Sequence, residues 1–341
     1  MTNFFAALVV ALLVALATVS PMLAYPISTE PWPEFEPLTP PANQGSITGL
    51  TYARVITGNV PVYASPADAV AGQAAIRQLA PGYVWVSLAG ERIQDPNGTV
   101  WYGINEAEYV QADYLQLSTP SAFHGTDSPR PGRFAWIVFQ TYTSPRPGVV
   151  PNGQKQWLKR YDMVSILEER MYDQRLWYRI AKGHWVEQGS VGIIAAKPRP
   201  EGVGPDEKWI EVDLYEQTLA AYEGDRLVYA TLVSSGLSHW ATVTGLYRVW
   251  VKIERGKMSG SEGQTDYYYL EDVPWSLYFH KNYALHGAYW HNRFGIKHSH
   301  GCVNLAPADA RWLFEWAGPA GQTNYTVADE ENPGTWVWIH E

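Results

Sequence analysis

The sequence is poor in cysteine and in charge. Cys302 is the only cysteine among 341 residues, so it has no intrachain disulfide partner. Charged residues make up 17% of the chain, with 25 Lys and Arg against 34 Asp and Glu. The basic residues form no run. Because binding to a phosphate backbone needs clustered Lys and Arg, we expect no nucleic-acid partner.

Aromatic side chains are abundant by contrast. The chain has 16 Trp and 22 Tyr, and hydrophobic residues reach 46% of the total. This is enough to build packed cores, and the length predicts two or three domains. A surface rich in aromatic side chains suits sugar or peptide ligands, although β-rich folds also use aromatic residues for packing.

The first residues form an apolar run over residues 4–19. The run predicts a secretory signal at residues 1–24, with cleavage after Ala24. An uncleaved membrane anchor is the alternative, because a secretory signal usually begins with basic residues and the first basic residue here is Arg54. A bilayer span needs about 20 apolar residues, however, and Pro21 ends this run early. Under either interpretation we expect the rest of the chain outside the cytoplasm, either secreted or associated with the cell wall, or anchored to the membrane by this segment alone.

Two segments rich in proline and glycine predict the connections between domains. Residues 25–48 read as a stiff, extended spacer, and residues 198–206 read as a linker. The chain after the second segment, residues 207–341, resumes strand patterns and is predicted to form one domain.

An internal repeat occupies the region between the two segments. The matching pieces are residues 63–66 (YASP) with 142–145 (YTSP), and residues 101–104 (WYGI) with 177–180 (WYRI). Short alternating strands separated by turn signals fill each copy. The two copies resemble bacterial SH3-like domains, which predicts two small β-barrels at residues 49–120 and 130–197. A single larger β-sandwich is the alternative.

Helical signal in the last third of the chain is confined to residues 307–316. Pro307 suits the first helical position, and Ala310, Leu313 and Phe314 form one apolar stripe. Trp312 and Trp316 fall beside the stripe and are interpreted as packing residues. Further upstream, the glycine-rich segment 254–263 is predicted to be a mobile loop. Such a loop could act as a lid, although a plain surface loop is the alternative.

The chemistry of the chain is expected around Cys302. Residues 299–304 read Ser-His-Gly-Cys-Val-Asn, and a second element, His286 followed by Gly287, lies a short way upstream. A thiol needs a base to become a strong nucleophile, and histidine is the usual partner. A lone cysteine close to histidines therefore indicates an acyl-transfer site. An inert core cysteine is the alternative, but the polar residues before Cys302 argue against it.

Five histidines surround the motif, namely His280, His286, His291, His298 and His300. Their number could suggest zinc. The sequence has no HExxH motif and no paired cysteines, so we expect no metal and no cofactor.

The motif resembles the signature of the L,D-transpeptidase family, also called the YkuD family. The similarity extends from about residue 208 to the C-terminus. Its upstream landmarks are residues 209–214 with 217–219, which resemble the opening strand pair of that domain, residues 233–236 and residues 242–245. Val243 departs from the pattern, because many family members have proline there. The resemblance implies a mainly β fold, in which two SH3-like barrels precede a YkuD-like domain with one short helix after the cysteine.

The resemblance also implies roles for the site residues. Cys302 is the expected nucleophile and His286 the expected base, with the Gly287 carbonyl holding the imidazole tautomer. His300 would lie on the oxyanion side, where the backbone N–H groups of Gly301 and Cys302 would donate. Ser299 would fix the turn and would also contact the substrate.

Three further side chains are expected to contact substrate. Asn304 could bind substrate amide or carboxylate groups, and Tyr289 and Trp290 could wall the cleft. The implied activity is cross-linking of peptidoglycan stem peptides, with carbapenem-type β-lactams as possible inhibitors. Hydrolysis of the same donor, or a cell-wall binding protein without activity, are the alternatives.

Overall fold

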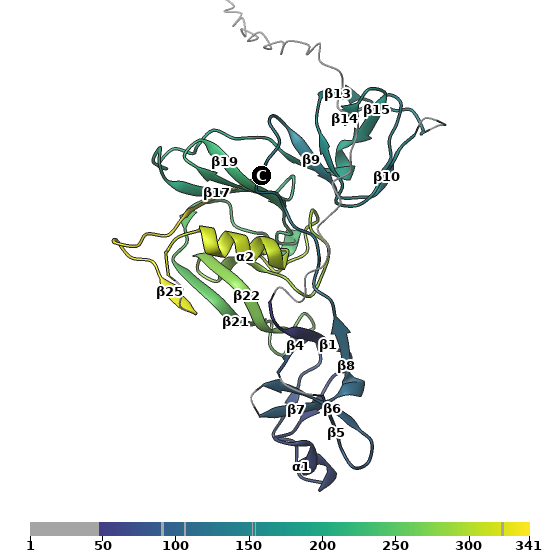
Figure 1. Ribbon diagram of the computed structural model, residues 1–341, viewed down its shortest axis with the longest axis vertical. Helices are drawn as coiled ribbons and strands as arrows, with labels where there is room; N and C mark the ends of the chain where they lie inside the picture. The colour runs from purple at the N-terminus through teal and green to yellow at the C-terminus, as the bar shows by residue number, and fades with distance from the viewer. Residues whose placement is uncertain (1–47, 90–91, 106, 152, 154, 322–323) are drawn as a thin grey trace, which may run out of the picture. The chain divides into compact units, whose positions relative to one another are not determined.

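The computed structural model describes residues 48–89, 92–105, 107–151, 153, 155–321 and 324–341. The predicted signal at residues 1–24 lies outside the described residues, as does the predicted spacer except for residue 48. Within the described part of the chain, no helix is both long and apolar enough to cross a bilayer. The fold is mainly β, as the sequence predicts (Figure 1).

The internal repeat has a clear structural counterpart. The first repeat contains β1 (Thr51–Val55), β2 (Val60–Val62), α1 (Pro66–Val70), β3 (Arg77–Leu79), β4 (Tyr83–Leu88), β5 (Arg92–Gln94), β6 (Val100–Asn105), β7 (Glu108–Gln111), η1 (Ala112–Tyr114) and β8 (Leu115–Ser118). The second contains β9 (Phe134–Ile137), β10 (Thr141–Tyr142), β11 (Trp157–Leu158), β12 (Met163–Ser165), β13 (Glu168–Tyr172), β14 (Arg175–Ala181), β15 (His184–Glu187), η2 (Gln188–Ser190) and β16 (Val191–Ile194).

Strand pairing is the same in the two repeats. The order β4-β1-β8 corresponds to β12-β9-β16, the pair β2-β3 to β10-β11, and β5-β6-β7 to β13-β14-β15. A duplication that the sequence shows in a few matching residues is therefore complete at the level of topology. In the described residues no sheet closes on itself, so the prediction of SH3-like barrels is not confirmed.

The C-terminal region is built on two sheets and one helix. Its elements are β17 (Lys208–Asp213), β18 (Thr218–Glu223), β19 (Arg226–Leu232), η3 (Ser238–Trp240), β20 (Gly245–Arg248), β21 (Val251–Gly260), β22 (Tyr268–His280), β23 (Tyr283–Gly287), β24 (Val303–Leu305), α2 (Pro307–Trp316), β25 (Tyr325–Val327) and β26 (Trp336–His340). The predicted helix and the predicted opening strands are confirmed. One sheet has the order β19-β18-β17-β26-β20, and β21 to β25 belong to the other.

The core of this region lies between the two sheets and α2 (Figure 1). Leu313 of α2 packs with Ile210 of β17 and Leu285 of β23, and all three side chains are almost fully buried. Trp312 stacks on Tyr229 with ring centroids 4.0 Å apart. This core fixes the ends of β23 and β24, where the sequence places its chemistry.

The prediction of a loop at residues 254–263 was wrong for most of that segment. Residues up to Gly260 belong to β21, which pairs antiparallel with β22, and the turn spans residues 261–267. The register shifts between Gly256 and Met258. A glycine inside a strand often marks such an irregularity. The glycines therefore mark a local break in the ladder rather than the end of the strand.

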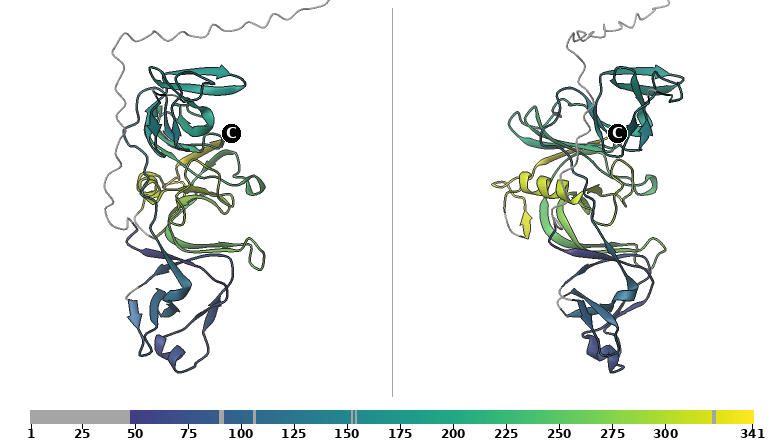
Figure 2. Two further views of the ribbon diagram at one scale, coloured as in Figure 1. Left: turned by 90° about the vertical axis from the view of Figure 1, so that its right-hand side faces the viewer. Right: turned by 45° about the vertical axis from the view of Figure 1, so that its right-hand side comes forward.

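The first repeat shares a sheet with the C-terminal region. Strand β4 pairs parallel with β22, and the resulting eight-stranded sheet contains β24-β23-β22-β4-β1-β8 together with β21 and β25. Figure 2 shows the β21–β22 hairpin, in green, lying against the strands of the first repeat. A hydrophobic cluster links Trp85, Trp136 and Trp290, which come from the first repeat, the second repeat and the C-terminal region.

The segment between the two repeats is held by a buried carboxylate at the start of α2. Asp309 Oδ1 accepts hydrogen bonds from the Gly125 amide and from the Tyr229 hydroxyl, both at 2.7 Å. The Thr231 hydroxyl donates to Oδ2 of the same carboxylate. Asp309 is fully buried, and burial raises its pKa to about 6. The chain entering the second repeat is thereby attached to the C-terminal core.

Candidate active site

The two adjacent strands β23 and β24 place Cys302 and His286 at one cavity. His286 is on β23, and its partner in the parallel pair is Asn304 of β24. Cys302 directly precedes β24. Both residues line a cavity of about 390 Å³, which His300, Ser299 and Asn304 also line. A larger cavity of about 820 Å³, beside Lys252 and Trp316, contains none of the motif residues.

Hydrogen bonds within the turn fix the backbone before Cys302. Ser299 Oγ accepts from the Gly301 amide at 3.0 Å and donates to the Cys302 carbonyl. Thr242 Oγ1 donates to the Gly301 carbonyl at 2.8 Å. Gly301 has φ of 120°, a conformation that favours glycine. The turn therefore depends on a glycine at this position.

This arrangement corrects one expectation about the oxyanion donors. The Gly301 N–H is already bonded to Ser299, so it is not free to donate to a substrate oxygen. For the Cys302 N–H, no hydrogen-bond partner is found among the described residues. Of the two backbone donors that the resemblance implies, Cys302 is the one that this geometry leaves available.

The buried side chain of Gln217 supports the turn before Cys302. The Gln217 side chain accepts from the Ser235 amide at 2.8 Å and donates to the Leu214 carbonyl at 2.7 Å. The Ser235 carbonyl in turn accepts from the His298 and Ser299 amides. The first β-hairpin of the C-terminal region thus positions the segment that carries the cysteine.

His286 is buried and neutral. Its side chain is 2% exposed, and burial lowers its pKa to about 4. Nδ1 lies 3.4 Å from the Gly287 carbonyl, its hydrogen-bond acceptor. The proton therefore resides on Nδ1, which leaves Nε2 unprotonated and able to act as a base.

Cys302 is a neutral thiol in this environment. Burial raises its pKa to about 11, although the Ala284 amide acts in the opposite direction. Sγ donates to the Asn282 carbonyl at 3.6 Å. The thiolate is therefore not formed before attack. A base must remove the proton during attack, which is the role that an unprotonated Nε2 on His286 can fill.

His300 is exposed and forms part of the cavity wall. Its ring lies 3.8 Å from the Trp240 ring and 4.9 Å from the Tyr268 ring, measured between centroids. These contacts hold the imidazole in the lining of the cavity that contains Cys302. The sequence could not place this side chain, because Gly301 turns the chain between the two residues.

Trp290 lines the cavity, but Tyr289 does not. Tyr289 is 1% exposed, stacks on Tyr52 with ring centroids 3.6 Å apart and donates to the Glu271 carbonyl at 2.6 Å. The prediction of Tyr289 as a cleft wall is therefore wrong. Of these two neighbouring aromatic residues, only Trp290 faces the cavity.

Several contacts around the cavity carry no clear sequence signal. Asn304 Nδ2 lies 2.9 Å from His291 Nε2, so Asn304 is held by a histidine that the sequence did not pair with it. Gly82 and Tyr83 of the first repeat also line the cavity. Their position depends on the pairing of β4 with β22, which no local pattern reveals.

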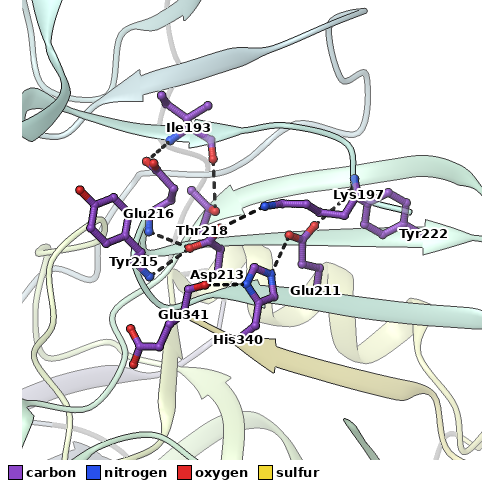
Figure 3. A network of polar contacts seen from close by, with 10 residues as sticks. All are labelled: Ile193, Lys197, Glu211, Asp213, Tyr215, Glu216, Thr218, Tyr222, His340 and Glu341. Carbon is purple, nitrogen blue, oxygen red and sulfur yellow. Dashed lines mark hydrogen bonds and ion pairs between the residues drawn. The ribbon is translucent and has the colours of Figure 1, made fainter. Parts of the chain in front are cut away.

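Figure 3 shows a second cluster of ionisable residues, none of which lines the cavity. Glu211, Asp213 and His340 bring their possible ligand atoms within 4.8 Å of one another. His340 Nε2 lies 3.0 Å from Glu211, and Lys197 Nζ lies 3.7 Å from Asp213. The contact with Glu211 raises the pKa of His340. His340 and the Lys197 ammonium group thus contact the two carboxylates of this cluster.

Comparison with known proteins agrees with the motif. Residues 207–339 match the YkuD family model, which describes an L,D-transpeptidase catalytic domain. These residues form a YkuD domain. The match does not extend to the two repeats.

Three relatives illustrate the similarity. YciB of Bacillus subtilis (strain 168), a protein named as an L,D-transpeptidase, is 31% identical over 123 residues, which are 31% of this chain and 59% of that protein. An L,D-transpeptidase from Stackebrandtia nassauensis is 26% identical, covers 42% of this chain and 59% of its own, and gives a TM-score of 0.30. The Enterococcus faecium catalytic domain acylated by ertapenem is 23% identical, covers 40% of this chain and 100% of its own, and gives a TM-score of 0.32. The chain thus spans less than two thirds of the first two relatives.

Proposed function

We propose that this protein is an L,D-transpeptidase that forms peptidoglycan cross-links outside the cytoplasm through a thioester on Cys302. One observation carries the proposal. A neutral thiol directly before β24 and a neutral imidazole on the neighbouring parallel strand β23 belong to the YkuD domain and line the same cavity. The substrate class is taken from the family to which that domain belongs.

In the proposed acylation, His286 Nε2 takes the thiol proton as Sγ attacks a carbonyl carbon of the donor tetrapeptide. This carbonyl belongs to the L-centre of the residue that precedes the terminal D-residue. The Cys302 amide and His300 are assigned to the developing oxyanion. The C–N bond then breaks, and the terminal D-residue leaves as an amine with the proton that His286 returns. A thioester remains on Cys302.

In the second half-reaction, the amine of an acceptor stem attacks the thioester. The proton that it loses passes through His286 to the leaving thiol, which restores Cys302. Asn304 and Trp290 are proposed to contact the substrate, since both line the cavity. Water in place of the amine would give hydrolysis, with a shortened stem as the product.

Mass spectrometry can test this function. The full chain is incubated with a disaccharide-tetrapeptide, and both the protein and the muropeptides are then measured. We expect an acyl adduct on Cys302 and cross-linked dimers, neither of which should form with Cys302→Ala. A tripeptide product without dimers would instead indicate a hydrolase. An unmodified wild-type protein without any product would leave only a binding role and would refute the proposal.

A further inference from the structure

The cavity that contains Cys302 is completed by two residues from outside the YkuD domain. Gly82 and Tyr83, at the start of β4, line it together with Cys302 and His286. These two residues belong to the first repeat, more than 200 positions before the cysteine. The YkuD match begins at residue 207 and does not include them.

Main-chain contacts hold Tyr83 in this place. Its amide donates to the Tyr267 carbonyl at 2.9 Å, and its Cα partner in the parallel ladder is Tyr268. The Tyr83 hydroxyl donates to the Trp290 carbonyl at 3.4 Å. At Gly82, an added Cβ would lie 2.6 Å from the Tyr267 carbonyl oxygen, so the two backbones are in close contact.

The rest of the junction between β4 and β22 contains paired polar groups. The Ser87 amide donates to Glu271 at 3.2 Å, and the Ser87 hydroxyl donates to Asp272. Tyr52 stacks on Tyr289. A buried carboxylate that lost its hydrogen bonds would raise the free energy of the folded state. This junction is therefore specific for one arrangement of β4 against β22. Tyr83 is therefore a fixed part of the cavity wall.

The wall around Tyr83 is aromatic and apolar. Met258, Tyr268, Leu270 and Trp290 line the cavity beside it, and no Lys or Arg lies among the described lining residues. A wall of this kind favours an uncharged, partly apolar segment, which packs on ring faces without losing an ion's hydration. Among the lining residues that the structure describes, Asp266 is the one carboxylate.

We propose that Tyr83 is a substrate-binding residue and that the first repeat and the YkuD domain form one composite subsite, which takes an uncharged segment of the donor stem peptide. This inference rests on the proposed function, because it uses the same cavity and the same substrate class. It goes beyond that function by giving a repeat outside the YkuD domain a direct part in recognising the substrate.

The test compares three variants of the full chain. Tyr83→Ala removes the ring, Tyr83→Phe keeps the ring and loses the hydroxyl, and Tyr102→Ala removes a half-buried tyrosine of the same repeat that is not in the cavity. For each, KM and kcat are measured with a disaccharide-tetrapeptide. The rate of Cys302 alkylation by iodoacetamide is measured with and without this substrate.

We expect Tyr83→Ala to raise KM about tenfold with little change in kcat, since truncating an aromatic contact in a binding site commonly costs that much. It should weaken substrate protection of Cys302 by a similar factor. The alkylation rate without substrate should stay within about twofold of wild type, which shows that the site itself is intact. Tyr83→Phe and Tyr102→Ala should behave like the wild type.

Unchanged KM and protection in Tyr83→Ala, with an active wild type, would overturn the subsite and leave the proposed function standing. An equal loss in Tyr102→Ala would also overturn it, because the effect would then be one of folding. If Tyr83→Ala does not fold, Tyr83→Leu replaces it, and the same loss of protection is expected. A wild type that forms no acyl adduct would refute the proposed function and the subsite together.

Discussion

Burial acts on Cys302 and His286 in opposite directions, and this determines how the site should respond to pH. The pKa of the thiol is raised to about 11 and that of the imidazole is lowered to about 4. Between these values both groups are neutral, so the base is available but the thiolate is not preformed. The reaction then depends on proton transfer at the moment of attack.

The acylation rate should therefore increase as the pH rises through about 4, where His286 loses its proton. It should then stay level across neutral pH. His286→Ala should lower the level region by about 10²–10⁴-fold, the usual contribution of a general base, and should remove the acidic limb. Stopped-flow measurement of carbapenem acylation against pH checks this. A rate that climbs through pH 8, as for a free thiol of pKa about 8.5, would contradict it.

A carbapenem-type β-lactam should form one covalent adduct, on Cys302. The strained amide resembles the donor carbonyl, and Cys302 is the only thiol in the chain. Intact-mass measurement should show a single added mass in the wild type and none in Cys302→Ala. Modification at any other residue, or an adduct that persists in the variant, would count against this site.

Asp309→Asn should destabilise the fold by about 1–3 kcal/mol, the cost of leaving a buried polar group badly paired. Asp309 accepts from three donors, and an amide nitrogen would face at least one of them. Urea unfolding of the two proteins measures the difference. Asp225→Asn serves as the control, because the Asp225 side chain is 79% exposed. Equal losses in both variants would show that the buried network is not the cause.

At the residue scale, the sequence predicts which side chains react but not which way their neighbours face. Cys302 and His286 stand out because their residue types and spacing are unusual. Tyr289 and Trp290 look equivalent in the sequence, yet one packs against Tyr52 and the other lines the cavity. That difference depends on how the chain after β23 packs against the first repeat, which is a tertiary property.

At the element scale, the decisive feature is the pairing of β4 with β22. Strands β17 and β18 and helix α2 could be predicted, since each has a local pattern of apolar residues. The parallel pair could not, because its partners are separated by most of the chain and both read as ordinary strands. The segment 254–260 was misassigned for a related reason, since glycines favour loops locally and pairing with β22 overrides them.

Glu271 makes the stability of this junction depend on pH. Burial raises its pKa from 4.5 to about 7, so the folded protein holds this proton more tightly than the unfolded chain does. The stability that this tighter proton binding gives to the fold is fully present below pH 4.5 and is lost as the pH rises through about 7. The full shift corresponds to about 3 kcal/mol, as an order of magnitude.

Glu271→Gln should reduce this dependence, because an amide does not titrate and can still accept from the Ser87 amide. Urea unfolding between about pH 5 and about pH 8 should show a flatter stability curve for the variant than for the wild type. Glu330→Gln provides a matched control on an exposed residue. If wild type and Glu271→Gln have parallel curves, Glu271 is not the group responsible.

At the scale of the whole molecule, the two repeats and the YkuD domain share a hydrophobic core. Trp85, Trp136 and Trp290 belong to one cluster although they come from three parts of the chain. The expectation of separate domains joined by linkers does not anticipate such a cluster, because the sequence shows the boundaries more clearly than the contacts across them. Unfolding of this region should therefore be cooperative.

We expect a single thermal transition, seen at the same temperature by tryptophan fluorescence and by the accessibility of Cys302 to a thiol reagent. Fluorescence reports on all three parts, whereas the thiol reports on the YkuD domain alone. Coincident curves are the signature of one cooperative unit. Two separated transitions would show that the repeats unfold independently of the domain that contains the cysteine.

The repeats have the same topology, but only the first lends a strand to the sheet of the YkuD domain. This difference has an evolutionary consequence. The second repeat keeps its β12-β9-β16 sheet to itself, whereas exchanging the first repeat for another small domain would remove β4 from beside β22. The first repeat and the YkuD domain should therefore be inherited together, with compensating substitutions across β4 and β22 in relatives that share this architecture.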